Sequence, residues 1–124
     1  MKEICNLAKE NNIWILEDCS QAHGALINGQ SVGSFGDVAV WSFCQDKIIT
    51  TGGEGGMITT NNEKLWDLIW SFKDHGKTIE AINKNKKSGF NYIHERFGSN
   101  FRLTEMQSAI GRYQLKKLKN WNFI

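Results

Sequence analysis

The sequence has no proline and only three cysteines, and both features narrow the structural possibilities. Average usage would place about six prolines in a chain of this length, whereas eight of the twelve glycines fall within residues 24–56 of the 124. Backbone freedom is therefore concentrated in one region. Cys5, Cys19 and Cys44 are odd in number and form no CxxC pair. This pattern argues against a disulfide framework or a metal site and favours free thiols in a reducing cytoplasm.

Long apolar runs are also missing. No uncharged apolar segment approaches the roughly eighteen residues that cross a bilayer. The first twelve residues, MKEICNLAKENN, lack the continuous apolar stretch of a signal peptide. We therefore expect a cytoplasmic protein with no membrane partner. Hydrophobic residues make up 40% of the chain, which excludes a fully disordered protein and fits one globular domain.

The small net charge of +2 conceals an asymmetry along the chain. Residues 1–72 carry 4 basic and 9 acidic side chains, whereas residues 73–124 carry 11 and 4. A basic half with interleaved aromatic residues can bind nucleic acid, and this half contains Phe90, Tyr92, Phe97 and Phe101. In a short chain, however, such asymmetry more often marks a solvated face.

The hydrophobic pattern predicts part of an α/β layered domain. Apolar spacing at i, i+3, i+4 predicts a helix over 2–11, and apolar runs predict strands over 13–16, 38–43 and 57–60. A second helix follows a cap at Asn61 or Asn62. Three covered strands give few buried positions, so we expect the chain to be marginally stable alone.

The last third of the sequence predicts one long loop and one helix. Residues 73–99 show no apolar periodicity and are rich in Lys, Asn and Gly, which indicates a long exposed loop. The T-x-x-Q pattern of Thr104 and Gln107 is a capping box that opens a helix to about residue 119.

Three polar side chains and a glycine-rich segment are candidates for one functional site. Asp18 and Ser42 fall near the carboxyl ends of two predicted strands, where open α/β sheets bind ligands. Lys47 follows five residues later, before the glycine-rich residues 50–56. A lysine amine can form a Schiff base, and an aspartate can keep a pyridine nitrogen protonated. These are the groups that a protein contributes to pyridoxal 5′-phosphate (PLP) chemistry.

Each of these features also has a simpler structural explanation. Lone lysines are mostly solvated, and a serine that ends a strand usually bonds to a turn. Residues 52–56 match neither the G-x-G-x-x-G fingerprint, since Ile58 stands where the third glycine belongs, nor a P-loop. His23 and His75 are compatible with ordinary turn or core positions. Spacing alone therefore leaves the PLP site as one possibility among several.

Longer motifs resemble those of the DegT/StrS family of PLP-dependent sugar aminotransferases. They agree in order and spacing, and they are Glu17–Ala25 (EDCSQAHGA), Gly33–Asp37 (GSFGD), Trp41–Lys47 (WSFCQDK), Thr50–Gly56 (TTGGEGG) and Gly98–Gln107 (GSNFRLTEMQ). The resemblance covers nearly the whole chain. Several linked motifs are far more specific than any one of them.

The resemblance implies a role for each matching residue. Lys47 would form the Schiff base with PLP and carry the proton between the cofactor and the substrate carbon. Asp18 would pair with the pyridine nitrogen, and Gln21 would face the ring near its phenolic oxygen. Ser42 would bind the cofactor phosphate, and Asn100 would reach the phosphate of the neighbouring subunit's cofactor. His23 and Glu54 fit the motifs without an assigned step.

The resemblance also implies a reaction and partners. Family members transfer an amino group from an amino acid, usually glutamate, to a nucleotide-linked keto sugar. The products enter polysaccharides, lipopolysaccharides or glycosylated natural products. Members form homodimers with shared active sites. Some relatives replace the lysine by histidine and act as dehydratases, which Lys47 argues against here.

Family members are several times longer than this chain. We therefore expect residues 1–124 to be the central part of the PLP-binding large domain of a fold-type I aminotransferase, with a mainly parallel sheet. The first part of that domain and the small domain would be absent, and the chain alone would be inactive and bind PLP weakly. Two alternatives remain: a non-catalytic remnant that dimerises through the helix from Thr104, and a basic nucleic-acid-binding module.

Overall fold

The computed structural model describes residues 1–84 and 93–121, which fall into two compact units. The first unit comprises Met1–Asn61 and Leu103–Ile124, so the chain leaves it and later returns. The second comprises Asn62–Arg102. Phe90 and Tyr92, the first two aromatic residues of the basic half, lie outside the described residues.

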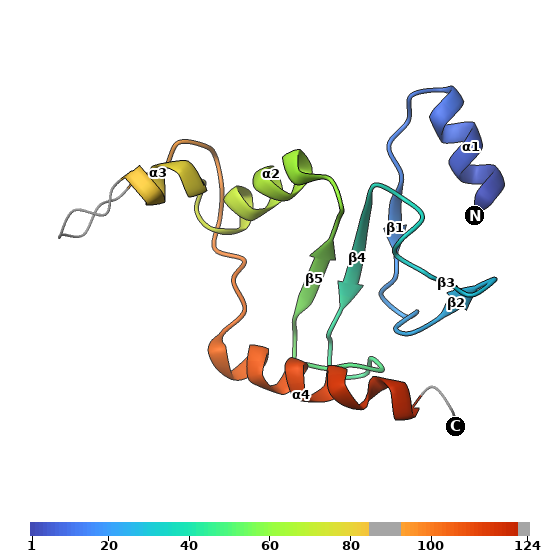
Figure 1. Cartoon of the computed structure of the whole chain (residues 1–124). Helices are drawn as coiled ribbons and strands as arrows, with labels where there is room; N and C mark the ends of the chain where they lie inside the picture. The colour runs from blue at the N-terminus through green and yellow to red at the C-terminus, as the bar shows by residue number, and fades with distance from the viewer. Residues whose placement is uncertain (85–92, 122–124) are drawn as a thin grey trace. The chain divides into compact units, whose positions relative to one another are not determined.

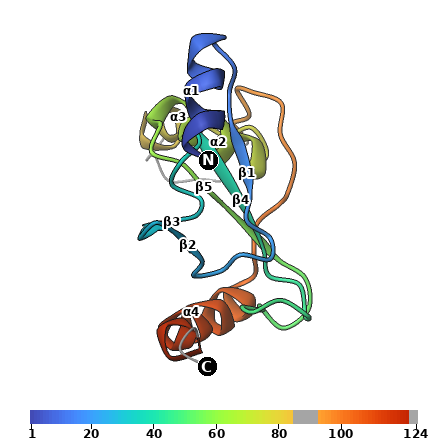
Figure 2. The same ribbon diagram turned by 90° about the vertical axis from the view of Figure 1, so that its right-hand side faces the viewer.

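The first unit is built on a three-stranded mixed sheet (Figures 1 and 2). Strand β4 (Val38–Ser42) lies between β1 (Leu16–Asp18) and β5 (Gly56–Thr59). Strands β1 and β4 are parallel, whereas β4 and β5 are antiparallel. Helices α1 (Lys2–Glu10) and α4 (Glu105–Trp121) complete the unit with a small hairpin. The prediction of an α/β fold is confirmed, with a sheet that contains one parallel and one antiparallel pairing.

The first strand begins three residues later than the apolar run predicts. The prediction of a strand over 13–16 is wrong for residues 13–15, and β1 instead includes the acidic pair that follows. Ile15 donates its N–H to the Asp37 side chain at 2.8 Å, and its carbonyl accepts the N–H groups of Asp37 and Val38, so paired strand residues begin only at Leu16. Leu16 and Trp14 are more than 60% exposed, so this segment is not covered on both faces within the described chain.

A hairpin occupies part of the connection between β1 and β4. Strands β2 (Leu26–Ile27) and β3 (Gln30–Ser31) pair in antiparallel register around Asn28 and Gly29. Both turn residues have positive φ, 52° and 81°, as a tight two-residue hairpin turn requires. This hairpin was not predicted, although an Asn-Gly pair beside apolar residues is its usual signal.

The described part of the second unit contains two helices. Helix α2 (Glu63–Lys73) is capped by Asn62, whose side chain accepts hydrogen bonds from the N–H groups of Lys64 and Leu65. This confirms the predicted cap. The prediction of a long exposed loop over 73–99 is wrong for residues 79–84, which form α3 (Ile79–Lys84), and residues 85–92 of that range lie outside the described residues. The Thr78 hydroxyl accepts the Ala81 N–H at 3.1 Å and so caps the start of α3, a feature that apolar periodicity does not reveal.

The buried core is small. Among the described residues, its hydrophobic members are Ala8, Cys19, Ala39 and Ile49 in the first unit and Ala81 in the second. Many large apolar side chains are exposed, among them Leu7 of α1, Leu16 of β1 and Met106 of α4. Such a core supports the expectation of marginal stability. Within the described residues, no helix has both the length and the apolar character needed to span a membrane.

The Glu17 carboxylate ties the sheet to the loop that precedes β4. It is buried and accepts three backbone N–H groups, from Gly33 at 2.9 Å and from Phe35 and Gly36 at 2.7 Å. The loop passes close to its neighbours, since a Cβ on Gly36 would lie 2.8 Å from the Ile15 carbonyl oxygen. A Cβ on Gly33, whose φ is +78°, would lie 2.5 Å from the Trp41 ring. Because these glycines have no side chain, the loop can lie close enough to β1 for the Glu17 carboxylate to accept its N–H groups.

We expect Glu17→Ala to lower the free energy of unfolding by about 3 kcal/mol or more, because it leaves three N–H groups without their charged acceptor. Glu17→Gln keeps one acceptor oxygen and should cost about 1–2 kcal/mol. Urea denaturation followed by circular dichroism measures both, with the exposed Glu10→Gln as the control. Equal urea midpoints of unfolding for Glu17→Ala and the control would show that the hydrogen bonds of Glu17 to the loop do not stabilise the fold.

Candidate active site

The carboxyl edge of two parallel strands brings the first two predicted site residues to one region. Asp18 ends β1 and pairs in register with Val40 of β4, so Ser42, which ends β4, lies two residues further along the neighbouring strand. Asp18 is exposed and Ser42 is half-buried. Parallel strands present their ends at the same edge of the sheet, which explains this meeting of an acid and a hydroxyl.

Lys47 lies in the turn that follows β4. Its N–H donates to the Cys44 carbonyl at 3.1 Å, and the residue is half-buried. Hydrogen bonds from Ser20 hold the pKa of Asp18 below its usual range, and the Lys47 ammonium lowers this pKa further. The lysine therefore acts electrostatically on the acid that ends β1, and Asp18 is ionised at neutral pH.

His23 and Gln21 lie in the connection that follows β1. They line a shallow pocket of about 280 Å³ with Ala22, Gly24, Ala25 and Ile48. Gln21 is exposed, whereas His23 is buried and packs near Trp41 and Phe43, with ring centroids 5.6 and 5.9 Å apart. Burial lowers the pKa of His23, and the charge of Lys47 acts in the same direction. This buried histidine is therefore neutral at pH 7.

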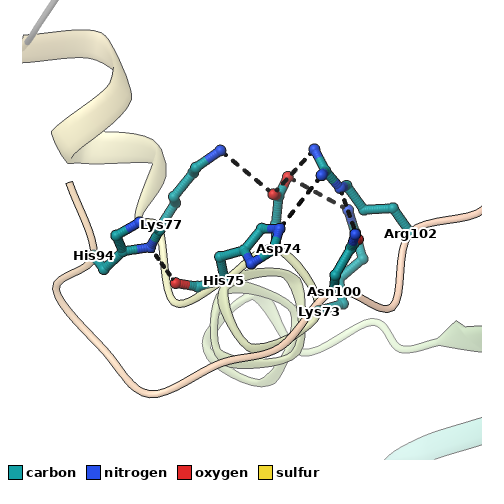
Figure 3. A network of polar contacts seen from close by, with 7 residues as sticks. All are labelled: Lys73, Asp74, His75, Lys77, His94, Asn100 and Arg102. Atoms are coloured by element: carbon teal, nitrogen blue, oxygen red, sulfur yellow. Dashed lines mark hydrogen bonds and ion pairs between the residues drawn. The ribbon is translucent and has the colours of Figure 1, made fainter. Parts of the chain in front are cut away.

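Asn100 belongs to the second unit. It forms an isolated bridge with Asp74, and its side-chain oxygen accepts the Arg102 Nε–H at 3.1 Å. Figure 3 shows Asn100 within a polar network in which three cationic side chains surround Asp74. The ion-pair distances from Asp74 are 3.9 Å to Lys73, 3.6 Å to Lys77 and 3.6 Å to Arg102. Asp74 thus offsets part of the basic charge of this unit.

The described residues, 1–84 and 93–121, contain no group of three His, Cys, Asp or Glu side chains that could hold a metal ion. The groups brought together at the sheet edge are instead one carboxylate, one hydroxyl and one amine. An organic cofactor that carries a phosphate and a carbonyl matches this set.

Comparison with known proteins identifies the chain's relatives. The model of the DegT/DnrJ/EryC1/StrS aminotransferase family matches residues 1–123. The chain belongs to this family. Its structure is a piece of the fold-type I aminotransferase fold, in agreement with the predicted family and fold.

Individual family members show how much of a relative this chain represents. GDP-perosamine synthase of Escherichia coli O157:H7 is 39% identical over 117 residues, which are 94% of this chain and 29% of the synthase. An aminotransferase structure from Psychrobacter cryohalolentis superposes with a TM-score of 0.90 at 52% identity, covering 96% of this chain and 30% of that one. The chain therefore spans about 30% of the length of these relatives.

A third relative carries the cofactor that the motifs suggest. The structure of E. coli GDP-4-keto-6-deoxy-D-mannose-3-dehydratase with bound hydrated PLP is similar at a TM-score of 0.77 and 31% identity. The match covers 97% of this chain and 33% of the dehydratase. Two reaction types, amination and dehydration, are thus present among the relatives.

The structure adds residues that sequence reasoning did not assign. Glu17 was named only as the first residue of the motif Glu17–Ala25, yet its carboxylate organises the loop of residues 33–36. The glycines at 33 and 36 were the available signal, since they expose unhindered N–H groups. Gln107 appeared only as a capping residue, yet its amide also donates to the Glu54 carbonyl.

We expect the burial of His23 to make stability depend on pH. Its folded pKa lies below the unfolded value of 6.5, so unfolding takes up a proton once the pH falls below about 6.5. The free energy of unfolding should therefore decrease from pH 7.5 to 5.5, by at most about 1.4 kcal/mol per pH unit from this group. Urea denaturation across this range should give a shallower pH dependence for His23→Gln. If the free energy of unfolding falls equally with pH in the unsubstituted protein and in His23→Gln, the pH dependence arises from other groups.

Proposed function

We propose that the protein carrying this chain is a PLP-dependent sugar aminotransferase. It would transfer an amino group from an amino acid, usually glutamate in this family, to a nucleotide-linked keto sugar for polysaccharide, lipopolysaccharide or glycoside biosynthesis. The observation that carries the proposal is the meeting of Asp18, Ser42 and Lys47 beyond the ends of β1 and β4, in a chain that matches the family model over residues 1–123.

The residues at this edge fit PLP chemically. Asp18, with its lowered pKa, can keep a pyridine nitrogen protonated. Ser42 offers a half-buried hydroxyl to a phosphate, and Gln21 offers an amide from the wall of the pocket. When bound, PLP supplies an electron-withdrawing ring that stabilises a carbanion on the substrate.

Lys47 has two tasks in this proposal. Its amine would hold the cofactor covalently as a Schiff base, and it would later move a proton to and from the reacting carbon. The lysine at this position favours transfer over dehydration, because the dehydratases of the resemblance carry a histidine there. The donor amino acid becomes a 2-oxo acid, and the keto sugar becomes an amino sugar.

The whole protein, and not this chain alone, is the proposed enzyme. Residues 1–124 would form the central part of its PLP-binding large domain. Asn100 would reach the cofactor phosphate of a second subunit in a homodimer. The three cysteines are free thiols, which suits work in a reducing cytoplasm.

Borohydride reduction with PLP, followed by peptide mass mapping, tests the cofactor assignment. The chain, and the chain extended by any flanking coding sequence, should be compared side by side. We expect a reduced pyridoxyl group on Lys47 in the extended protein and weak labelling in the short chain. Lys47→Ala should abolish it, whereas Lys64→Ala, at an exposed position of α2, should leave it unchanged.

Activity of the extended protein tests the reaction itself. With glutamate and a nucleotide-linked keto sugar, we expect an amino sugar and 2-oxoglutarate in equal amounts, and a loss of about 10²–10⁴-fold in turnover for Lys47→Ala. Loss of a sugar hydroxyl without transfer of the amino group would indicate a dehydratase and contradict the proposal.

Two other outcomes would favour the alternatives. Copurification of an unlabelled chain with a full-length relative, without activity, would indicate a dimerising remnant. Salt-sensitive binding to single-stranded nucleic acid without Lys47 labelling would indicate a binding module. Phe97 is 98% exposed and Phe101 64%, so two of the aromatic residues in the basic half are accessible in this structure.

A further inference from the structure

The loop between β4 and β5 is closed at its base by backbone hydrogen bonds. We call residues 43–55 the lysine loop, since Lys47 lies within it. Phe43 donates its N–H to the Gly55 carbonyl at 2.8 Å and accepts the Thr51 N–H at 3.1 Å. Cys44 and Gly53 form a bridge just beyond. The hydrogen bond of Lys47 to Cys44 is local, so it shapes the turn but does not fix the turn on the sheet.

Helix α4 binds the returning limb of this loop through two glutamine side chains. Gln107 donates from Nε2 to the Glu54 carbonyl at 2.8 Å, and the Gln114 Oε1 accepts the Thr50 N–H at 2.8 Å. The two residues are seven positions apart and therefore lie on one face of the helix. Figure 1 shows the loop running beside α4.

Close packing accompanies these hydrogen bonds. Gly111 lies between the two glutamines on α4, and a Cβ there would be 3.0 Å from the Thr51 methyl carbon. Thr51 is 1% exposed, and its hydroxyl donates to the Glu54 carbonyl at 3.1 Å. The helix thus contacts the loop from residue 50 to residue 54 and leaves little space for it to shift.

Gln107 has two separable functions. Its Oε1 accepts the Thr104 N–H at 3.0 Å, while its own N–H donates to the Thr104 hydroxyl at 3.2 Å, which completes the predicted capping box. Its Nε2 is the atom that reaches Glu54. A glutamate at 107 would keep the cap but could not donate to the loop.

We propose that Gln107 and Gln114 are positioning residues that hold the lysine loop against α4 and thereby place the Lys47 amine. This inference rests on the proposed function, because it gives Lys47 the role stated above. The lysine is three residues from Thr50, so a loop released from the helix changes the position from which the amine acts. A displacement of about 1 Å at a reacting group can lower a rate about a hundredfold.

The experiment compares paired variants of the extended protein. Gln107→Glu keeps the cap and loses the donor, and Gln114→Leu loses the acceptor for Thr50. Gln114→Glu restores an acceptor and is the conservative rescue. Arg112→Gln, at an exposed position of the same helix, is the matched control. Circular dichroism confirms that each variant retains its helix.

Amide hydrogen exchange gives the readout that does not depend on activity. Gln114→Leu should speed exchange of the Thr50 amide about tenfold or more, and Gln107→Glu should speed exchange of its neighbours in the loop. Gln114→Glu should recover most of the protection. The control should exchange as the unsubstituted protein does.

Kinetics and titration connect the loop to Lys47. We expect Gln107→Glu and Gln114→Leu to lower kcat about 10–100-fold with little change in KM. Both substitutions should also shift the pH dependence of the absorbance of PLP bound to Lys47. Wild-type exchange rates and pH profiles in both variants, with Lys47 still labelled in the unsubstituted protein, would overturn the inference and leave the proposed function intact. Absence of Lys47 labelling in every form would overturn both.

Discussion

The first unit depends on one buried carboxylate. Glu17 accepts three backbone N–H groups from a loop that lies 16 to 19 residues further along the chain. A buried charge is stable only when it is well hydrogen-bonded, so the loop and the strand must form together. Asp18 follows Glu17 directly, and the position of the site acid is therefore set by its neighbour's contacts.

The candidate site combines fixed strand ends with an adjustable loop. Asp18 and Ser42 belong to paired strands, whose register places them without further help. Lys47 lies in a turn and not in a strand, so its position depends on the contacts that the loop makes. In this molecule the loop touches α4, an element formed about sixty residues later. A reactive group on a loop thus gains its support from a helix distant in sequence.

Local chemistry was predictable from the sequence, and distant partners were not. The Asn62 cap and the Thr104–Gln107 capping box follow from residues within one helical turn, and both are confirmed. The strand shift at Ile15 depends on Asp37, which no local window includes. Helix α3 has only six residues, too few to show a clear period. The family motifs indicated Lys47, Asp18, Gln21, Ser42 and Asn100, whose roles remain predictions.

The discontinuity of the first unit has a consequence for how the sequence can vary. The hydrogen bond between Thr50 and Gln114 joins residues 64 positions apart, and the entire second unit lies between them. The entropy of closing such a long connection grows only with the logarithm of its length, so doubling it costs about 0.6 kcal/mol. Within residues 62–97 this connection can therefore lengthen or shorten while α4 still returns to the same face, whereas the proposed role of Asn100 requires residues 98–102 to keep their structure. The chain thus separates a connection whose length can vary from motif residues that must keep their geometry.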